Sequence, residues 1–160
     1  GAERLVIYSM SNYGVAITLS QAKQFIRRYF EGYAGVRAWH ERALRDFKSI
    51  PMVRTLSGRL RYLDPDSHGE VFNTPVQGTG ADGLKSSLPL VYRALQKYGG
   101  RAKLVHMVHD EIVTEVDDDP ELVLAVKKDL QDAMVNGMQP FLKTIQVVAE
   151  PDVGDSWAAH

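Results

Sequence analysis

The fold of this chain is decided by the stretch Lys103-Leu-Val-His-Met-Val-His-Asp-Glu-Ile-Val-Thr-Glu-Val116. Two apolar runs, 104–108 and 112–116, flank a polar centre of His-Asp-Glu at 109–111. Val, Ile and Thr favour strands, and the polar gap is short enough for a hairpin turn. The stretch therefore predicts a β-hairpin that carries three titratable side chains at its turn.

The neighbouring carboxyl groups of Asp110 and Glu111 suggest a cation site at this turn. Carboxylates that lose water repel each other and cost free energy unless a cation neutralises them. We expect the hairpin to carry both residues to the rim of a sheet, where a metal ion can bind. The alternative is a polar turn that faces water, because polar residues dominate turns.

The composition of the chain limits its class. Its 160 residues suit one ordinary domain, and 44% hydrophobic residues can form a core. The net charge of −1 provides no overall basic field, so a polyanion must be held by local Lys and Arg or by another chain. Disulfides and thiolate metal sites are excluded because cysteine is absent. No apolar run reaches about 18 residues, so we expect no membrane span.

The remaining sequence predicts helices and two further β segments. In order, we expect a helix or strand end at Leu5–Tyr8 stopped by Gly14, a helix capped by Ser20, a second helix reaching Lys48, a hairpin of 53–56 and 59–63, a long helix from the Asn73 region to Gly99, a helix from Asp119 to Asn136-Gly137, and a strand over 144–149. Gly78, Gly80 and Gly83 lie in the long helix, where glycine permits close approach of a backbone or a ligand. This mixture predicts an α+β fold, with a small antiparallel sheet packed on long helices.

Five stretches, in chain order, carry a family resemblance. They are Tyr8-Ser-Met-Ser-Asn-Tyr-Gly14, Thr55-Leu-Ser-Gly-Arg59, Asn73-Thr-Pro-Val-Gln-Gly-Thr-Gly-Ala-Asp82, Val108-His-Asp-Glu111 and Gly154-Asp-Ser-Trp157. Together they resemble the C-terminal half of the polymerase domain of family A (polymerase I-like) DNA polymerases. The resemblance implies the end of the fingers and following helices at 1–50, and the palm subdomain at 51–160.

The resemblance also implies an activity and a set of ligands. A family A polymerase is a DNA-directed nucleotidyltransferase that uses two Mg²⁺ ions, primer–template DNA and deoxynucleoside triphosphates, in replication within a prokaryotic cytoplasm or for a virus. Asp110 would be a metal ligand, Glu111 a supporting carboxylate, and His109 a neighbour of the primer end. In phosphoryl transfer, two metal ions held by carboxylates activate the attacking hydroxyl and stabilise the leaving group.

Further site residues follow from the same resemblance. Asn73 and Gln77 would contact minor-groove acceptors, which all base pairs share, so that fit is checked without sequence preference. Arg59 would lie near the nucleic-acid backbone, as arginines commonly do. Tyr8 would lie at the nascent base pair.

Several features of the family pattern are missing. The second catalytic Asp and the Arg and Lys that grip the triphosphate lie before the point where this sequence begins. Arg4 stands where the family has an aromatic residue, Ser9 replaces a glycine, and Gly69 stands where an Arg usually precedes Asn73. We therefore expect about half of an active site, completed by an N-terminal polymerase chain as in a split polymerase.

Three other interpretations remain open at this point. The chain could be a decayed remnant of a polymerase, or a DNA-binding or scaffold module that kept the fold without catalysis. His106, His109 and Asp110 could instead form the metal site of a hydrolase. Residues three apart on a strand point to opposite faces, which argues against ligation by His106 and His109 together.

Overall fold

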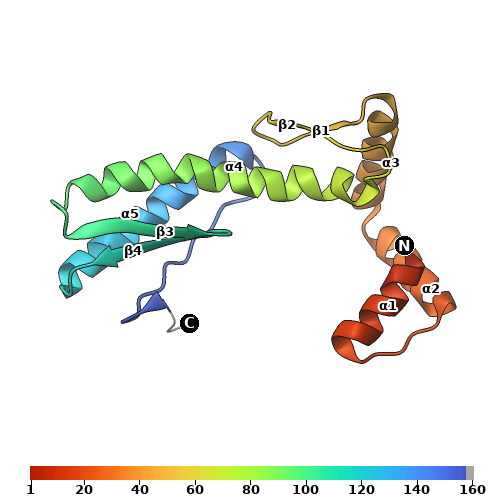
Figure 1. The fold of residues 1–160 in the computed structure, drawn as a ribbon, viewed down its shortest axis with the longest axis horizontal. Coiled ribbons are helices and arrows are strands. Elements are labelled where there is room, and N and C mark those ends of the chain that lie inside the picture. Colours follow the sequence, from red (N-terminus) through yellow and green to blue (C-terminus); the bar gives the residue numbers. More distant parts are fainter. Residues whose placement is uncertain (158–160) are drawn as a thin grey trace. The chain divides into compact units, whose positions relative to one another are not determined.

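The computed structural model describes residues 1–157, which form two compact units divided after Pro51 (Figure 1). The first unit contains three helices, α1 (Ala2–Tyr13), α2 (Leu19–Gly32) and α3 (Ala34–Ser49). Helix α1 ends at Gly14, whose φ of 65° is left-handed, as a glycine stop signal predicts. The segment around Leu5–Tyr8 is therefore helical.

The cap of α2 differs from the sequence-based expectation. Thr18, not Ser20, is the N-cap, and its side chain accepts a hydrogen bond from the backbone of Gln21 at 3.2 Å. The Gln21 side chain in turn accepts from the Thr18 backbone N–H at 2.8 Å, which completes a capping box. Ser20 was the wrong choice because only Thr18 has a Gln three residues later.

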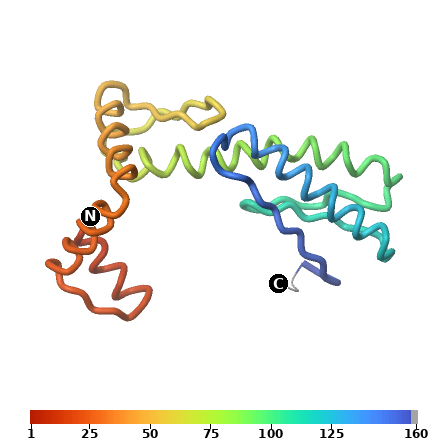
Figure 2. The backbone as a smooth tube through the Cα atoms, turned by 180° about the vertical axis from the view of Figure 1, so that it is seen from behind, coloured from red at the N-terminus to blue at the C-terminus, as the bar shows by residue number. Residues whose placement is uncertain are grey.

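The second unit is built on two long helices and a hairpin. Helix α4 (His68–Gln96) packs against helix α5 (Pro120–Met138), and strands β3 (Ala102–Val108) and β4 (Glu111–Val116) form an antiparallel pair. Figures 1 and 2 show this hairpin running beside the C-terminal half of α4, with its turn directed toward the middle of the helix. The expected α+β class is confirmed.

The core of this unit lies between the hairpin and the two helices. Its buried members come from all four elements and are Val91, Leu95, Ala102, Ile112, Leu122, Val126, Leu130 and Ala133. On α5 these side chains recur every three or four residues, which is the spacing of one helix face. Asp119 caps α5 by accepting from the backbone of Glu121 at 3.0 Å, and Pro120 occupies the first turn, as expected.

A second, smaller hairpin lies near the start of α4. Strands β1 (Met52–Arg54) and β2 (Leu60–Tyr62) are antiparallel, with the pairs Met52–Tyr62 and Arg54–Leu60 at their ends. The predicted hairpin is therefore confirmed, with Gly58 in the turn at a φ of 95°. This hairpin packs on the N-terminal half of α4 and contributes to the candidate site below.

One prediction for the C-terminal region was wrong, and one helix ends a residue later than expected. Residues 144–149 are not a strand, because no neighbouring strand among the described residues offers them a ladder; side chains hold the backbone instead. Gln139 accepts from the Val147 N–H at 3.0 Å, and Gln131 donates to the Ala149 carbonyl at 2.8 Å. Gly137 does not end α5 but lies buried inside it, against Ser87 of α4.

None of the helices in the part of the chain that the structure describes is long and apolar enough to cross a membrane. The short 3₁₀ helix η1 (Gln139–Phe141) follows α5.

Candidate active site

The hairpin turn presents the predicted acidic residues to solvent. Val108 pairs directly with Glu111, so His109 and Asp110 form a two-residue turn between β3 and β4. His109 has a φ of 51°, which is uncommon for a residue other than glycine. His109, Asp110 and Glu111 are all exposed, so the turn can offer both carboxylates to a ligand.

The donor set at this turn fits part of a divalent metal site. Asp110 and Glu111 supply hard carboxylate oxygens, which Mg²⁺ prefers. Among residues 1–157, no group of three or more His, Asp or Glu side chains is arranged to hold a metal. A Mg²⁺ ion bound here would therefore take further oxygen ligands from outside the described residues or from a substrate.

His106 does not join the turn. It pairs with Val113 on the ladder, and its ring lies edge-on to Trp157, with 5.4 Å between the ring centroids. His106, His109 and Asp110 do not form a shared ligand group among the residues described. This arrangement gives no support to a His/Asp hydrolase centre.

Helix α4 presents a polar, sterically open face in its N-terminal half. Asn73 and Gln77 are four residues apart, so they lie on one face, and both are exposed. Gly80 continues this face, and a Cβ added there would meet no atom within 4 Å. A ligand could therefore approach this part of the helix backbone closely. We call Asn73, Gln77 and Gly80 the amide face.

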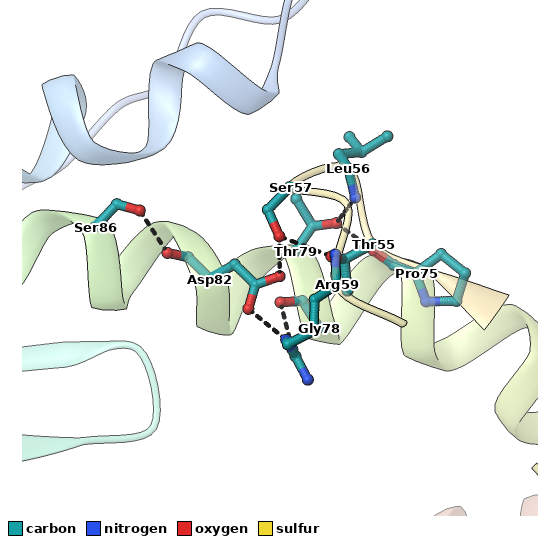
Figure 3. A network of polar contacts seen from close by, with 9 residues as sticks. All are labelled: Thr55, Leu56, Ser57, Arg59, Pro75, Gly78, Thr79, Asp82 and Ser86. Atoms are coloured by element: carbon teal, nitrogen blue, oxygen red, sulfur yellow. Dashed lines mark hydrogen bonds and ion pairs between the residues drawn. The ribbon is translucent and has the colours of Figure 1, made fainter. Parts of the chain in front are cut away.

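The opposite side of the same helix segment is bound by the β1–β2 turn (Figure 3). The buried carboxylate of Asp82 accepts from Ser57 Oγ at 2.6 Å and from Arg59 Nε at 2.7 Å. Arg59 Nη2 also donates to the Gly78 carbonyl at 3.2 Å. We call this group, with Thr55, the Asp82 network.

Two further contacts tighten the same junction. The Leu56 N–H donates to Thr79 Oγ1 at 3.0 Å, and Thr79 Oγ1 donates to the Pro75 carbonyl at 2.5 Å. Gly78 leaves room for the turn, because a Cβ there would lie 2.7 Å from Thr55 Cγ2. The expectation of close backbone approach is thus met at Gly78, while Gly80 is open.

The environment of Asp82 keeps its carboxyl group ionised. Burial alone would raise the pKa of Asp82, but hydrogen bonds from Ser57, Thr55 and Arg59, together with the Arg59 charge, lower it below the ordinary value. The side chain of Asp82 is 9% exposed and that of Arg59 is 46% exposed. The pair is therefore a half-buried ion pair rather than a solvated surface contact.

Sequence reasoning missed the role of Asp82. It placed Arg59 near DNA, whereas the structure gives the Arg59 guanidinium two partners within the protein. Asp82 lies on the side of α4 away from Asn73 and Gln77, and its partner Arg59 is 23 residues earlier in the chain. No local pattern links the two residues, so the sequence offered no signal for this pair.

Tyr8 belongs to the first unit and lies near the middle of α1. Its side chain is 53% exposed. Its ring meets that of Tyr13 edge-on at 5.8 Å, and a hydrogen bond with Tyr13 raises the pKa of Tyr8. The face of the Tyr8 ring is therefore partly open to solvent, and its expected place at the nascent base pair stays a prediction.

The described residues thus combine an α+β fold, a hairpin turn with two exposed carboxylates and a long helix with an amide face. The model of DNA polymerase family A matches residues 5–159, and the chain belongs to this family.

Relatives and a solved structure agree with the assignment. The chain is 35% identical over 158 residues to DNA polymerase I of Aquifex aeolicus (strain VF5), covering 98% of this chain and 27% of that protein. It is 36% identical over 168 residues to the thermostable DNA polymerase I of Thermus thermophilus, covering 95% and 19%. The chain thus spans about a quarter or less of these relatives' length.

A solved structure of a polymerase domain is also similar to this chain. The POL domain of Pol1 from M. smegmatis, in a complex with DNA primer-template and dNTP, superposes with a TM-score of 0.63 at 28% sequence identity. The similarity covers 82% of this chain and 27% of that one.

Proposed function

We propose that this chain is the C-terminal part of a template-directed DNA polymerase domain. In this proposal residues 51–160 are the palm and residues 1–50 the end of the fingers. The observation that carries the proposal is the family match over residues 5–159, which includes the carboxylate turn and the amide face. The chain then supplies one part of a catalytic centre rather than all of it.

In this proposal the hairpin turn holds metal through Asp110. Mg²⁺ bound there would supply charge stabilisation for nucleotidyl transfer. Asp110 provides a ligand oxygen, and Glu111, the next residue, supports the site by its charge and by orienting water. His109, which has a φ of 51° in the turn, would lie beside the primer end.

The amide face of α4 would contact duplex DNA in the minor groove. Asn73 and Gln77 can donate to the acceptors that every base pair presents there. Gly80 leaves the backbone open to the duplex. These acceptors are the same in every base pair, so the two neutral amides would respond to the geometry of a correctly formed pair and not to its sequence. Tyr8 would stack at the nascent base pair with an incoming deoxynucleoside triphosphate.

A second catalytic carboxylate must come from a polypeptide segment that carries the rest of the polymerase domain. The test mixes the chain with such an N-terminal polymerase segment and measures extension of a labelled primer on a template with Mg²⁺. We expect no extension by the 160-residue chain alone and measurable extension by the mixture. Extension by the purified chain alone would contradict the proposal. Duplex binding without extension in any mixture would favour a DNA-binding or scaffold role.

A further inference from the structure

Two sequence motifs that are separate in the chain form one physical unit. The turn at 55–59 and the helix segment at 73–82 are joined by the Asp82 network. Among the described residues, no buried side-chain polar atom lacks a hydrogen-bond partner. The arrangement needs both motifs, because the side-chain donors to the buried Asp82 carboxylate come from the turn. A change in the turn is therefore expected to alter the helix segment, and a change in the segment to alter the turn.

The network and the amide face lie on different sides of one helix. With 100° per residue, Asn73 and Gln77 are about 40° apart, whereas Gln77 and Asp82 are about 140° apart. The β1–β2 turn therefore contacts the side of the helix away from the amide face and leaves the amide face exposed. Figure 3 shows Ser57 and Arg59 of the turn meeting Asp82 of the helix.

This helix segment is weak without the turn. Pro75 has no N–H and removes one helical hydrogen bond. Gly78 and Gly80 add backbone freedom on either side of Thr79. The turn compensates at the same place, since Arg59 holds the Gly78 carbonyl and the Leu56 N–H reaches Thr79. These are the residues next to Gln77.

We propose that Asp82 is a positioning residue: through Arg59 and Ser57 it holds the segment around Gln77 helical, so that Asn73 and Gln77 present their amides together. The assignment of those amides to DNA rests on the proposed function. In this proposal Arg59 acts on DNA contact through the helix rather than as a phosphate ligand, with its Nε donating to Asp82 and its Nη2 to the Gly78 carbonyl.

The first test needs no DNA. Asp82→Asn removes the negative charge at almost unchanged volume, so the ion pair with Arg59 is lost. Amide hydrogen exchange at residues 77–79 should accelerate at least about tenfold relative to wild type, while exchange at Val91 and Leu95 in the same helix stays within about twofold. Uniform acceleration along α4 would show a merely structural role and overturn the proposal.

Two further variants keep this test decisive. Ser57→Ala removes one hydrogen bond from an exposed turn residue and should give the same local pattern at smaller size. Glu70→Gln is the matched control, since Glu70 pairs with Arg61 of the same hairpin at 2.6 Å but near the start of α4. Equal acceleration at residues 77–79 in Glu70→Gln and Asp82→Asn would also overturn the proposal.

The second test links the network to DNA. Affinity for a primer–template duplex is measured by fluorescence anisotropy at several salt concentrations. Asp82→Asn and Arg59→Ala should weaken binding with the wild-type salt slope, because no phosphate contact is lost. A slope that falls by about one unit in Arg59→Ala would instead identify Arg59 as a phosphate ligand. If wild type does not bind, the proposed function fails, while the exchange pattern still decides the role of Asp82.

Discussion

Two glycines inside helices should respond oppositely to the same added methyl group. Gly137 of α5 lies against the backbone of Ser87 in α4: a Cβ at Gly137 would be 2.6 Å from Ser87 Cα and 2.6 Å from its N. Gly80 of α4 has nothing within 4 Å of such a Cβ. Both positions are helical, so Gly→Ala brings the same gain in helix propensity at each.

The expected changes in unfolding free energy follow from comparing Gly80→Ala with Gly137→Ala. An alanine in a helix is favoured over glycine by about 1 kcal/mol, so Gly80→Ala should raise the free energy of unfolding by up to that amount. Forcing an extra carbon into a packed contact costs about 1–3 kcal/mol. The free energies of unfolding of Gly80→Ala and Gly137→Ala should therefore differ by about 1–3 kcal/mol, since the propensity gain cancels.

Urea denaturation followed by far-UV circular dichroism measures this difference directly. Gly83→Ala is a useful third variant because the three atoms nearest to its added Cβ belong to the flexible side chain of Met138. It should fall between the other two. Equal free energies of unfolding for Gly80→Ala and Gly137→Ala would refute the close contact of α4 and α5 at Ser87.

Three further expectations test other parts of the molecule. Thr18→Ala should cost the first unit about 1 kcal/mol of stability through loss of the capping box, and Ser20→Ala much less; thermal denaturation of both variants distinguishes the two caps. Asp82 has a lowered pKa in the folded protein, so its stabilising contribution is present above about pH 4 and is lost as the pH falls through the folded value. The gap in unfolding free energy between wild type and Asp82→Asn should accordingly shrink below pH 4, and a constant gap from pH 6 to pH 3 would contradict the ion pair. Gln77→Ala should slow extension by the completed enzyme while the salt slope of DNA binding stays unchanged, because a neutral amide releases no counterion.

Local signals were sufficient for much of the fold. The β3–β4 hairpin could be predicted because apolar runs flank a short polar gap, and the start of α5 because Asp119 and Pro120 form a cap and a first turn. Both depend on neighbours in sequence. The strand expected over 144–149 failed for the opposite reason: strand propensity has no effect unless another strand lies alongside.

Parts of the candidate site likewise follow from local sequence pattern, while others depend on long-range packing. The positions of Asp110 and Glu111 at the hairpin turn follow from local pattern, and their proposed roles come from the resemblance. The partnership of Arg59 with Asp82 spans 23 residues and depends on how the small hairpin docks on α4. Sequence pattern does not specify that docking, so the pairing of Arg59 with Asp82 was not predicted, and the expected position of Arg59 near the nucleic-acid backbone stays a prediction.

The central claim is that Asp110 holds catalytic metal in the completed polymerase. Asp110→Asn keeps the shape of the side chain but removes the charge of the ligand, whereas Glu111→Gln changes a supporting group. Single-turnover incorporation of one nucleotide, with each variant combined with the N-terminal polymerase segment, measures the chemical step directly. The account predicts that Asp110→Asn abolishes incorporation while DNA affinity stays near wild type, and that Glu111→Gln loses less. A near wild-type rate for Asp110→Asn, or a larger loss for Glu111→Gln, would contradict it.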